Sequence, residues 1–453
     1  MLKKLASMIS GSKADYVDIR YEVKKETSAV LAGTDLKKAG SNSTDGFVVR
    51  SLNNGGFSAV TVTREEDVPE AIRLAIEGAD AMSGEGKVVK MAPVEPAQDW
   101  VEPELEIDPA TIALEEKIKL LRKYNDLMLS VAEIANTNMG YSEVDREKFF
   151  VSSEGASIRE RICTVSISGE AIARRDNLTQ NIRVAVGGAS GFKSLLNRDE
   201  VFLKRAKLAK ELLDAEPVKA GTYDVIINPG LTGTFIHEAF GHFSEADIIE
   251  NNPPLRARMA MDSRIGSDVV NIIADTTIPD QVGFYKYDDE GTPVRKVSLM
   301  TKGVLTGRLH SRRTAAEFNE PVSGHAVAED HRYEPIVRMG MIYLDKGKKT
   351  FDELLTQLGD GLYICDGKGG QTSGENFTFG AQYGYVVKAG EIKGMIRDIN
   401  IMGNMFTTMK NIEAVDDQIR FSERGGCGKG QLNIKSGYGG PSVLIRSMVI
   451  GGV

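Results

Sequence analysis

Strict alternation of apolar and polar residues is the feature that most limits how the first half of this chain can fold. In "DYVDIRYE", Val17, Ile19 and Tyr21 fall on one face of an extended segment, and charged residues fall on the other. Successive side chains of a strand point to opposite faces, so this pattern predicts a half-buried antiparallel strand. "GFVVRSL", "NNGG" and "FSAVTVT" then predict a hairpin, because glycines supply the positive φ angles of a tight turn.

Helical and extended patterns alternate up to about residue 215. Apolar residues at spacings of three and four predict a helix over 114–131, and alternation predicts further strands within 139–195. Other helices are expected over 65–82 and near 198–215. Residues 88–109 contain four prolines in an acidic stretch, which indicates a connector that lies over a surface.

The pattern changes after residue 216, where glycines and short strands dominate. Only two segments there have a clear helical pattern, residues 230–249 and 349–360. We therefore predict an α+β fold with two domains. Residues 1–216 form an N-terminal α/β domain with a mixed or antiparallel sheet, and residues 217–453 form a glycine-rich, strand-dominated C-terminal domain that carries the 230–249 helix.

The composition is that of an ordinary soluble globular protein, with 453 residues, of which 41% are hydrophobic and 26% charged. A formal net charge of −8 argues against nucleic acid as the main ligand, and no apolar run is long enough to span a membrane. The N-terminal segment lacks the apolar stretch of a signal peptide. Three scattered cysteines do not make a disulfide framework, so we expect a cytoplasmic protein.

The sequence HEAFGH, residues 237–242, places two of the five histidines five positions apart, with a glutamate after the first. These residue types bind zinc and deprotonate water beside it. Histidines four apart share a helical face, but five apart they point about 140° apart on a regular α-helix. A π-type turn would bring them within about 50°. We therefore predict such a turn, and we expect Gly241 to permit it because glycine has no Cβ.

A third ligand must come from elsewhere, and Cys427 in "SERGGCGKGQ" is the best candidate. Flanking glycines let the backbone approach an ion, and Lys429 would help to hold the sulfur as a thiolate. The alternative is that Cys427 is only a small residue in a tight turn. Glu245 and Asp247 follow the second histidine on the same predicted helix, where they would hydrogen-bond a ligating imidazole.

With "HEAFGHFSEAD" and "GGCGKGQ" identified, the chain resembles the TldD type of subunit in the TldD/PmbA family of metallopeptidases. The likeness also covers "DGFVVRSLNNGGFSAVTVT", "GTYDVIINPG" and "GYGGPSVLIRSMVIGG". The resemblance implies a zinc-dependent peptidase in which His237, His242 and Cys427 bind Zn²⁺ and Glu238 is the general base. It also implies unfolded or extended peptide substrates, and a dimer formed with a TldE/PmbA-like companion subunit or with a second copy.

The segment "GHAVAEDHRYEP" holds two further histidines, and the resemblance does not assign them. His325 could bind substrate carbonyls or stabilise an oxyanion, and Arg313 could bind a peptide carboxylate. Either could equally be an idle surface residue. The roles of His310 and His331 stay open.

Two other functions compete with this one. Dipeptidyl peptidase III-type zinc enzymes also use a six-residue histidine motif, but they need a downstream glutamate segment, and "ENNPPLRARMAM" lacks it. A non-catalytic assembly subunit is the second alternative, and it would hold no stoichiometric metal.

Overall fold

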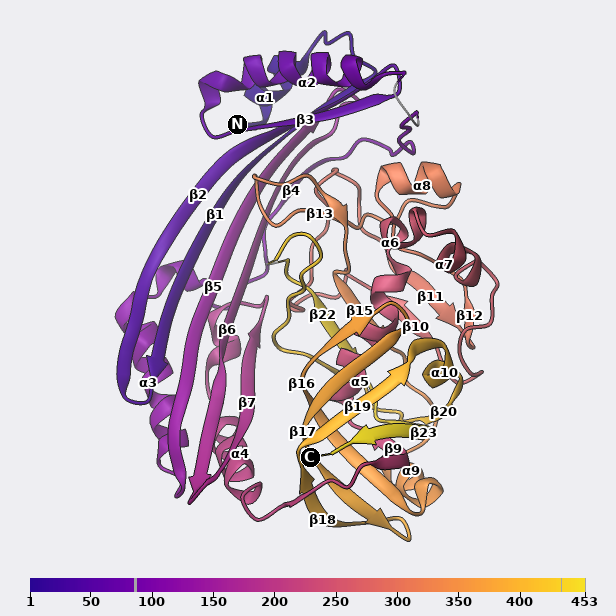
Figure 1. The fold of residues 1–453 in the computed structure, drawn as a ribbon. Helices are drawn as coiled ribbons and strands as arrows, with labels where there is room; N and C mark the ends of the chain where they lie inside the picture. Colours follow the sequence, from indigo (N-terminus) through magenta and orange to yellow (C-terminus); the bar gives the residue numbers. More distant parts are fainter. Residues whose placement is uncertain (85–87, 433, 453) are drawn as a thin grey trace.

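The computed structural model describes residues 1–84, 88–432 and 434–452 (Figure 1). A long, curved sheet occupies the first part of the chain, in the order β3-β2-β1-β5-β6-β4, with β7 paired to β6. All neighbouring strands are antiparallel except β4, which runs parallel to β6. This is the mixed sheet that was predicted. The strands are β1 (Tyr16–Ala32), β2 (Asp35–Asn53), β3 (Gly56–Val62), β4 (Gln98–Val101), β5 (Ile134–Ser152), β6 (Ser157–Arg175) and β7 (Leu178–Gly188).

Helices cover one face of this sheet at its two ends, as Figure 1 shows. α1 (Leu2–Ile9) and α2 (Val68–Met82) pack on one end of β1 and β2, whereas α3 (Leu114–Leu129) and α4 (Asp199–Glu211) pack on β5 to β7. The helices predicted from apolar spacing are therefore confirmed, with ends a few residues inside the predicted ones. Short 3-10 turns lie between them: η1 (Glu65–Asp67), η2 (Pro109–Thr111) and η3 (Phe192–Leu195).

The hairpin between β2 and β3 is also confirmed. Its two turn residues, Asn54 and Gly55, have φ angles of 50° and 79°. Two successive residues in the left-handed region make the turn whose twist matches that of paired strands. The turn residues thus explain why the strands reverse at this point.

The prediction of a half-buried β1 is wrong. Alternation is present, but the charged face is buried too: Asp18, Arg20 and Glu22 are at most 2% exposed. The second part of the chain packs against this face and supplies charged partners, among them Asp289 and Glu290. Alternation identifies the two faces of a strand, but it does not show that another part of the chain covers the polar one.

Residues 88–109 are more ordered than a connector. They contribute β4, which adds a short edge strand to the sheet, and Asp108 caps η2 by accepting a hydrogen bond from Ala110. Trp100 nevertheless lies on the surface, 62% exposed, beneath the guanidinium of Arg159. The surface position was predicted correctly, whereas the strand was not predicted.

The second part of the chain contains a closed barrel. Strands β16, β9, β23, β19 and β17 pair in that order, and β17 pairs back with β16. β8, β18 and β20 extend this sheet. Its strands are β8 (Glu216–Pro217), β9 (Gly221–Ile227), β16 (Gly361–Ser373), β17 (Asn376–Lys388), β18 (Glu391–Arg397), β19 (Ile399–Asn404), β20 (Ile412–Val415) and β23 (Val443–Gly451).

A second sheet lies beside the barrel, in the order β12-β11-β10-β15-β22-β21. Its strands are short, and the glycine-rich β22 lies near its edge. The strands are β10 (Ile272–Ala274), β11 (Val297–Thr301), β12 (Val304–Leu305), β15 (Met341–Leu344), β21 (Arg420–Phe421) and β22 (Gly437–Gly440), and a separate pair is formed by β13 (Ala326–Val327) and β14 (Ile336–Val337). Strands dominate this part of the chain, as predicted.

The predicted helix over 230–249 is a broken run of short elements. These are α5 (Pro229–Phe235), η4 (Ile236–Phe240), η5 (Gly241–Ser244) and α6 (Ala246–Glu250). The predicted helix over 349–360 is confirmed as α9 (Phe351–Leu358). Three short helices were not predicted: α7 (Pro253–Arg258), α8 (Arg312–Phe318) and α10 (Met405–Lys410).

One apolar core joins the barrel, the second sheet and the helical segment between them. The boundary predicted between residues 216 and 217 falls at β8, and the division into two domains stays a prediction. Within the described residues, no helix is long and apolar enough to cross a membrane.

Candidate metal centre

The segment that carries the histidine motif begins at a well-capped helix. The Asn228 side chain accepts a hydrogen bond from the backbone N–H of Leu231, and Pro229 occupies the first turn. Phe235 then packs edge-on against Phe377 of the barrel, with ring centroids 5.4 Å apart. These contacts fix the direction in which the chain enters the motif.

The predicted π turn is confirmed. η4 is a single π turn, Ile236–Phe240, and it is followed at once by the 3-10 turn η5. The change of winding brings the rings of His237 and His242 to 5.3 Å between centroids. A regular α-helix would have pointed them apart, so the turn is what lets the two imidazoles face a common point.

The missing Cβ of Gly241 does matter, but through packing rather than through backbone freedom. Its φ and ψ, −56° and −47°, are ordinary helical values that any residue adopts. Space is the constraint instead, because a Cβ at this position would lie 2.3 Å from Sδ of Met339. Glycine lets η5 pack directly on the chain beside β15, and that packing holds His242 in place.

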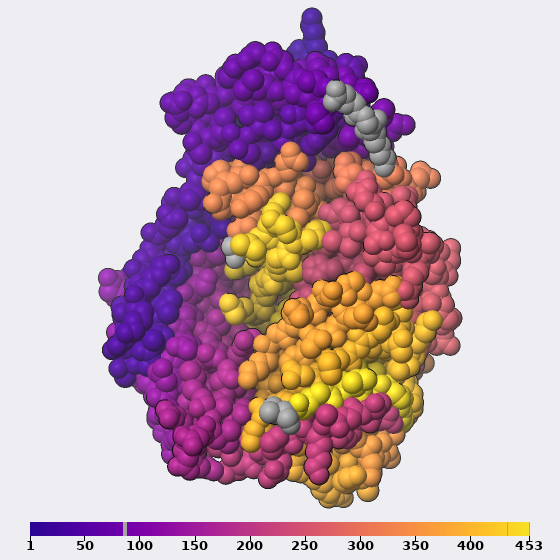
Figure 2. All heavy atoms as spheres, viewed as in Figure 1, coloured from indigo at the N-terminus to yellow at the C-terminus, as the bar shows by residue number. Residues whose placement is uncertain are grey.

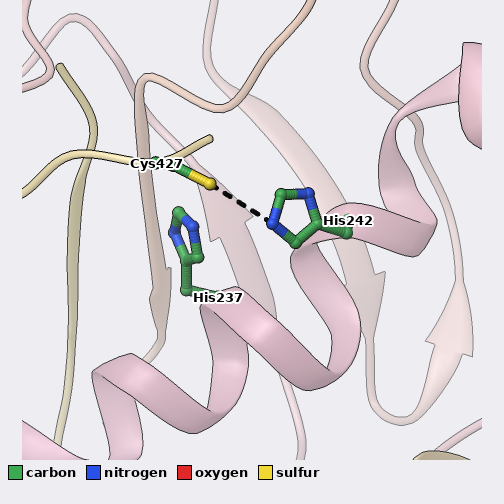
Figure 3. A group of neighbouring side chains, drawn as sticks. All are labelled: His237, His242 and Cys427. Carbon is green, nitrogen blue, oxygen red and sulfur yellow. Dashed lines mark hydrogen bonds between the residues drawn. The ribbon is translucent and has the colours of Figure 1, made fainter. Parts of the chain in front are cut away.

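Cys427 meets the two histidines from 185 residues further along the chain (Figure 3). Its loop is pinned by a hydrogen bond from its backbone N–H to the carbonyl of Ile434, 3.0 Å. Sγ lies 3.3 Å from Nε2 of His242. One potential ligand atom from each of His237, His242 and Cys427 lies within 4.8 Å of the other two.

The chemistry of these three side chains fits a bound metal ion. Burial, with help from the nearby His242, lowers the pKa of His237 to about 3, so its imidazole is neutral and offers a lone pair. Nδ1 of His237 is buried and has no hydrogen-bond partner among the described residues. Imidazole nitrogens and a thiolate are the donors that Zn²⁺ prefers.

His242 is held in a charged form when no metal is present. Burial acts to lower its pKa, but the hydrogen bonds to Cys427 and Glu245 outweigh burial and raise the pKa to about 10. Sγ of Cys427 and Oε2 of Glu245 therefore contact the two ring nitrogens of a charged imidazole. A metal ion would replace the shared proton, as metal binding to such ligands generally does.

Glu238 stands beside this group with its carboxylate partly open to solvent. Oε2 lies 3.8 Å from Nε2 of His242, and the side chain is 32% exposed. Burial raises its pKa. A carboxylate with a raised pKa is a stronger base, and partial exposure leaves it able to reach a substrate.

Glu245 lies directly behind His242. It is fully buried, and its Oε2 is 3.0 Å from Nδ1 of the imidazole. Arg338, which is also fully buried, places Nε 3.8 Å from Oε1 of Glu245. This arrangement fixes the imidazole ring and leaves Nε2 to face Cys427. No pattern in the sequence pointed to Arg338.

Two expectations about this region are wrong. Asp247 contacts neither histidine; it accepts hydrogen bonds from Lys429 and from the backbone of Val337. Lys429 does not hold the thiolate, because its ammonium lies 2.7 Å from Asp247 and 3.1 Å from Glu245. The backbone is extended at Glu245, with φ −79° and ψ 116°, so α6 leaves in a new direction and takes Asp247 away from the histidines.

The two predicted substrate-binding residues lie elsewhere. His325 is fully buried, with Nδ1 2.9 Å from the carbonyl oxygen of Ser323, so its ring has no exposed surface to meet a substrate. Arg313 makes a two-point ion pair with Glu250, at 2.7 and 2.8 Å. Of the unassigned histidines, His310 faces Glu320 and His331 packs against Gly46 of β2.

One aromatic residue near the centre had no sequence signal. Tyr438 of β22 lies edge-on to His237, with centroids 5.7 Å apart, and it lines a cleft of about 860 Å³ between the two parts of the molecule. Figure 2 shows part of the hollow, with the loop that carries Cys427 drawn in yellow between the first sheet and the barrel. The cleft thus reaches Tyr438, beside the candidate metal centre.

Comparison with known proteins gives matches along most of the chain. Three domain models match in order: PmbA/TldA metallopeptidase domain 1 over residues 17–83, the central domain over 107–215 and the C-terminal domain over 220–452. A metalloprotease of Synechocystis sp. is 34% identical, over 97% of this chain and 96% of its own length. A zinc metalloprotease TldD homolog of Saccharolobus solfataricus is 28% identical, over 97% of each chain.

The fold also has a solved counterpart. The crystal structure of TldE from Thermococcus kodakarensis superposes with a TM-score of 0.77 and 17% sequence identity, over 97% of each chain. At this identity the likeness concerns the fold alone.

Proposed function

Because this chain belongs to the PmbA/TldA metallopeptidase family, we propose that it is a zinc-dependent peptidase that hydrolyses unfolded or extended peptides. The observation that carries the proposal is the convergence of His237, His242 and Cys427, within 4.8 Å of one another, beside the partly exposed Glu238. In this proposal the two imidazoles and the thiolate hold the ion. The ion would supply Lewis acidity, which polarises a peptide carbonyl and makes water easier to deprotonate.

Glu238 is the general base in this proposal. Its carboxylate takes a proton from the attacking water and returns it to the departing amide nitrogen, so that one side chain serves both half-reactions. Burial raises its pKa, which strengthens it as a base, and its exposed edge lets it reach the peptide. Glu245 holds His242 in one orientation while this occurs.

We further propose a dimer, with a TldE/PmbA-like companion subunit or with a second copy of the chain. The likeness of this fold to a solved TldE supports a companion of similar shape. A reducing compartment, the cytoplasm, suits the reaction because the Cys427 thiol must stay free to bind metal.

The proposal is tested by measuring metal content and peptidase activity on the same preparations. We expect wild type to hold about one zinc ion per chain, and Cys427→Ala to lose most of it. Cys163→Ala is the matched control, since Cys163 is also buried but lies in β6, outside the centre. Glu238→Gln should keep its zinc while turnover falls by about 10²–10⁴-fold.

The outcomes separate the alternatives. Retained proteolysis in Glu238→Gln would remove that residue from the role of base. A wild-type protein with no stoichiometric zinc and no activity, assayed alone and with a companion subunit, would favour the non-catalytic assembly subunit.

A further inference from the structure

The cleft beside the candidate metal centre is a single space lined from both parts of the chain. Two adjoining cavities, of about 280 Å³ and 860 Å³, share the lining residues Ser142, Arg424 and Lys435. Ser142 comes from β5 of the first sheet, and the two cations flank the loop that carries Cys427. The cleft therefore runs along the loop and between the two parts of the molecule.

The metal-binding loop fixes the position of both cations relative to the centre. Cys427 pairs with Ile434 across the loop, so Lys435 lies one residue from the paired position. On the other side Gly425, next to Arg424, packs so closely that a Cβ would lie 1.9 Å from the carbonyl oxygen of Ser436. Tyr438, which touches His237, lines the same cleft. A ligand in the cleft would thus contact the cations and reach Tyr438, which lies beside His237.

Three cations in the cleft form no ion pair within 4 Å with an acidic side chain of the described residues: Arg183 of β7, Arg424 and Lys435. Lys435 is exposed to solvent in the cleft, and partial enclosure by the protein, with the charges of Arg424 and Lys24, lowers its pKa although nearby Glu26 acts to raise it. A positive charge lowers the pKa of a lysine only when it is nearby, so Arg424 and Lys24 lie near Lys435. The chain as a whole carries a formal net charge of −8, so this positive group does not follow from the composition.

The acidic residues of the cleft are already engaged, and Glu329, which lines the smaller cavity, accepts a hydrogen bond from the backbone N–H of Leu432. Asp366 pairs with Arg205 at 2.5 Å, Glu423 pairs with Arg198 at 2.9 Å, and Glu26 lies 3.3 Å from Lys24. Glu170 accepts hydrogen bonds from Asn138 and Asn181. The three free cations are therefore available to an anion that enters the cleft.

We propose that Arg424 and Lys435, with Arg183 across the cleft, bind a carboxylate of the substrate peptide, so that acidic peptides are the preferred substrates. This inference rests on the proposed peptidase function and adds the substrate class. Guanidinium and ammonium groups form strong charge-assisted hydrogen bonds with carboxylates, and both groups already face the space that the peptide must occupy. The carboxylate comes either from an aspartate or glutamate side chain or from the peptide's C-terminus.

The test uses short fluorogenic peptides of neutral residues, in which one glutamate is moved along the sequence, with glutamine counterparts at each position. Each peptide is made as the free acid and as the C-terminal amide. The quantity measured is kcat/KM of the zinc-loaded protein, together with its companion subunit where activity requires one. Wild type should favour at least one acidic peptide over its neutral counterpart by about tenfold. If the preference requires a glutamate in the peptide, the carboxylate comes from a side chain. If the preference is lost when the C-terminus is amidated, the carboxylate is the terminal one.

Variants then assign the preference to residues. In Lys435→Gln and Arg424→Gln the ratio of kcat/KM for the acidic peptide to kcat/KM for the neutral peptide should fall towards one. Lys435→Glu should reverse the preference, in favour of a lysine-containing peptide. Lys410→Gln is the control, since Lys410 is exposed on α10 outside the cleft, and it should keep the wild-type ratio. Peptide binding to Glu238→Gln, followed by fluorescence anisotropy, should show the same preference without turnover.

Failure of this inference differs from failure of the peptidase function. If wild type hydrolyses acidic and neutral peptides equally well, or if the cleft variants keep the wild-type ratio, the carboxylate site is refuted and the peptidase stands. If no peptide of any charge is hydrolysed but acidic peptides still bind with the predicted preference, the peptidase function fails and the carboxylate site stands. Equal binding of acidic and neutral peptides without hydrolysis would refute both.

Discussion

At the scale of single residues, the orientation of His242 depends on one buried carboxylate. Glu245 bonds Nδ1 of the imidazole and is itself flanked by Lys429 and Arg338. Burial alone would raise the pKa of Glu245, but His242 and the two cations outweigh burial and lower the pKa, so the carboxylate stays ionised. An ionised partner on Nδ1 leaves Nε2 free for a metal ion and makes it a better donor.

Glu245→Gln should therefore weaken zinc binding by about 10–100-fold, because the amide keeps the shape of the side chain but loses its charge. The measurement is a competition titration with a coloured chelator. Asp247→Asn is the control: it changes a neighbouring carboxylate that also contacts Lys429 but touches neither histidine. Equal zinc affinity in wild type and Glu245→Gln would show that the contact with His242 does not support the metal.

The sequence predicted the members of this centre better than their surroundings. Spacing suggested His237 and His242, the flanking glycines suggested Cys427, and the family resemblance implied the three together. The role given to Asp247 failed because it assumed an unbroken helix, whereas the chain bends at Glu245. The role given to Lys429 failed because its ammonium pairs with Glu245 and Asp247 instead. Arg338 has no local pattern, since only the folded chain brings it to Glu245.

At the scale of elements, the centre depends on a change of winding inside one helical segment. The π turn η4 and the 3-10 turn η5 together rotate His242 towards His237. Spacing of five predicted the first change, because no regular helix brings such residues together. It could not predict the second, which follows from the packing of Gly241 against Met339.

Gly241→Ala should destabilise this packing by about 1–3 kcal/mol and displace His242, since the added methyl group would lie 2.3 Å from Sδ of Met339. Both unfolding free energy and zinc content should fall. Gly394→Ala is the control, because a Cβ there meets nothing within 4 Å and the residue lies on the exposed strand β18. If steric overlap is the cause, Met339→Ala combined with Gly241→Ala should cost less than the two single changes together. Strictly additive costs would refute that cause.

At the scale of the whole molecule, buried charged residues, together with small apolar clusters such as that of Phe150, Ile158 and Tyr287, join the first sheet to the second part of the chain. Asp289 lies 3.0 Å from Arg146, 3.1 Å from Lys148 and 3.3 Å from Arg20, and it is 1% exposed. The sequence identified β1 and its charged face but could not identify the layer that covers this face, because its ion-pair partners lie far away in the sequence. Arg20 and Asp289, for example, are about 270 positions apart. These ion pairs between Asp289 and the first sheet hold the curved sheet against the second part of the chain, beside the cleft.

The ion pairs of Asp289 should make the free energy of unfolding depend on pH in a defined direction. Burial acts to raise the pKa of Asp289, but Arg146, Lys148 and Arg20 outweigh it and hold the pKa well below its usual value. A carboxyl group whose pKa is lower in the folded state stabilises the fold fully above its unfolded pKa, near roughly pH 4. That contribution is lost as the pH falls from there through the folded pKa.

Asp289→Asn should consequently lower the unfolding free energy by about 3–5 kcal/mol at neutral pH, because it leaves three buried cations without their shared partner. The measurement is denaturant unfolding of both proteins at neutral pH and again below roughly pH 4, where the difference should narrow as wild type loses the same contribution. Asp176→Asn, an isosteric change in the exposed turn before β7, should match wild type at both values. A difference that stays constant with pH would mean that Asp289 contributes packing rather than charge, and that the two parts of the molecule are joined by other contacts.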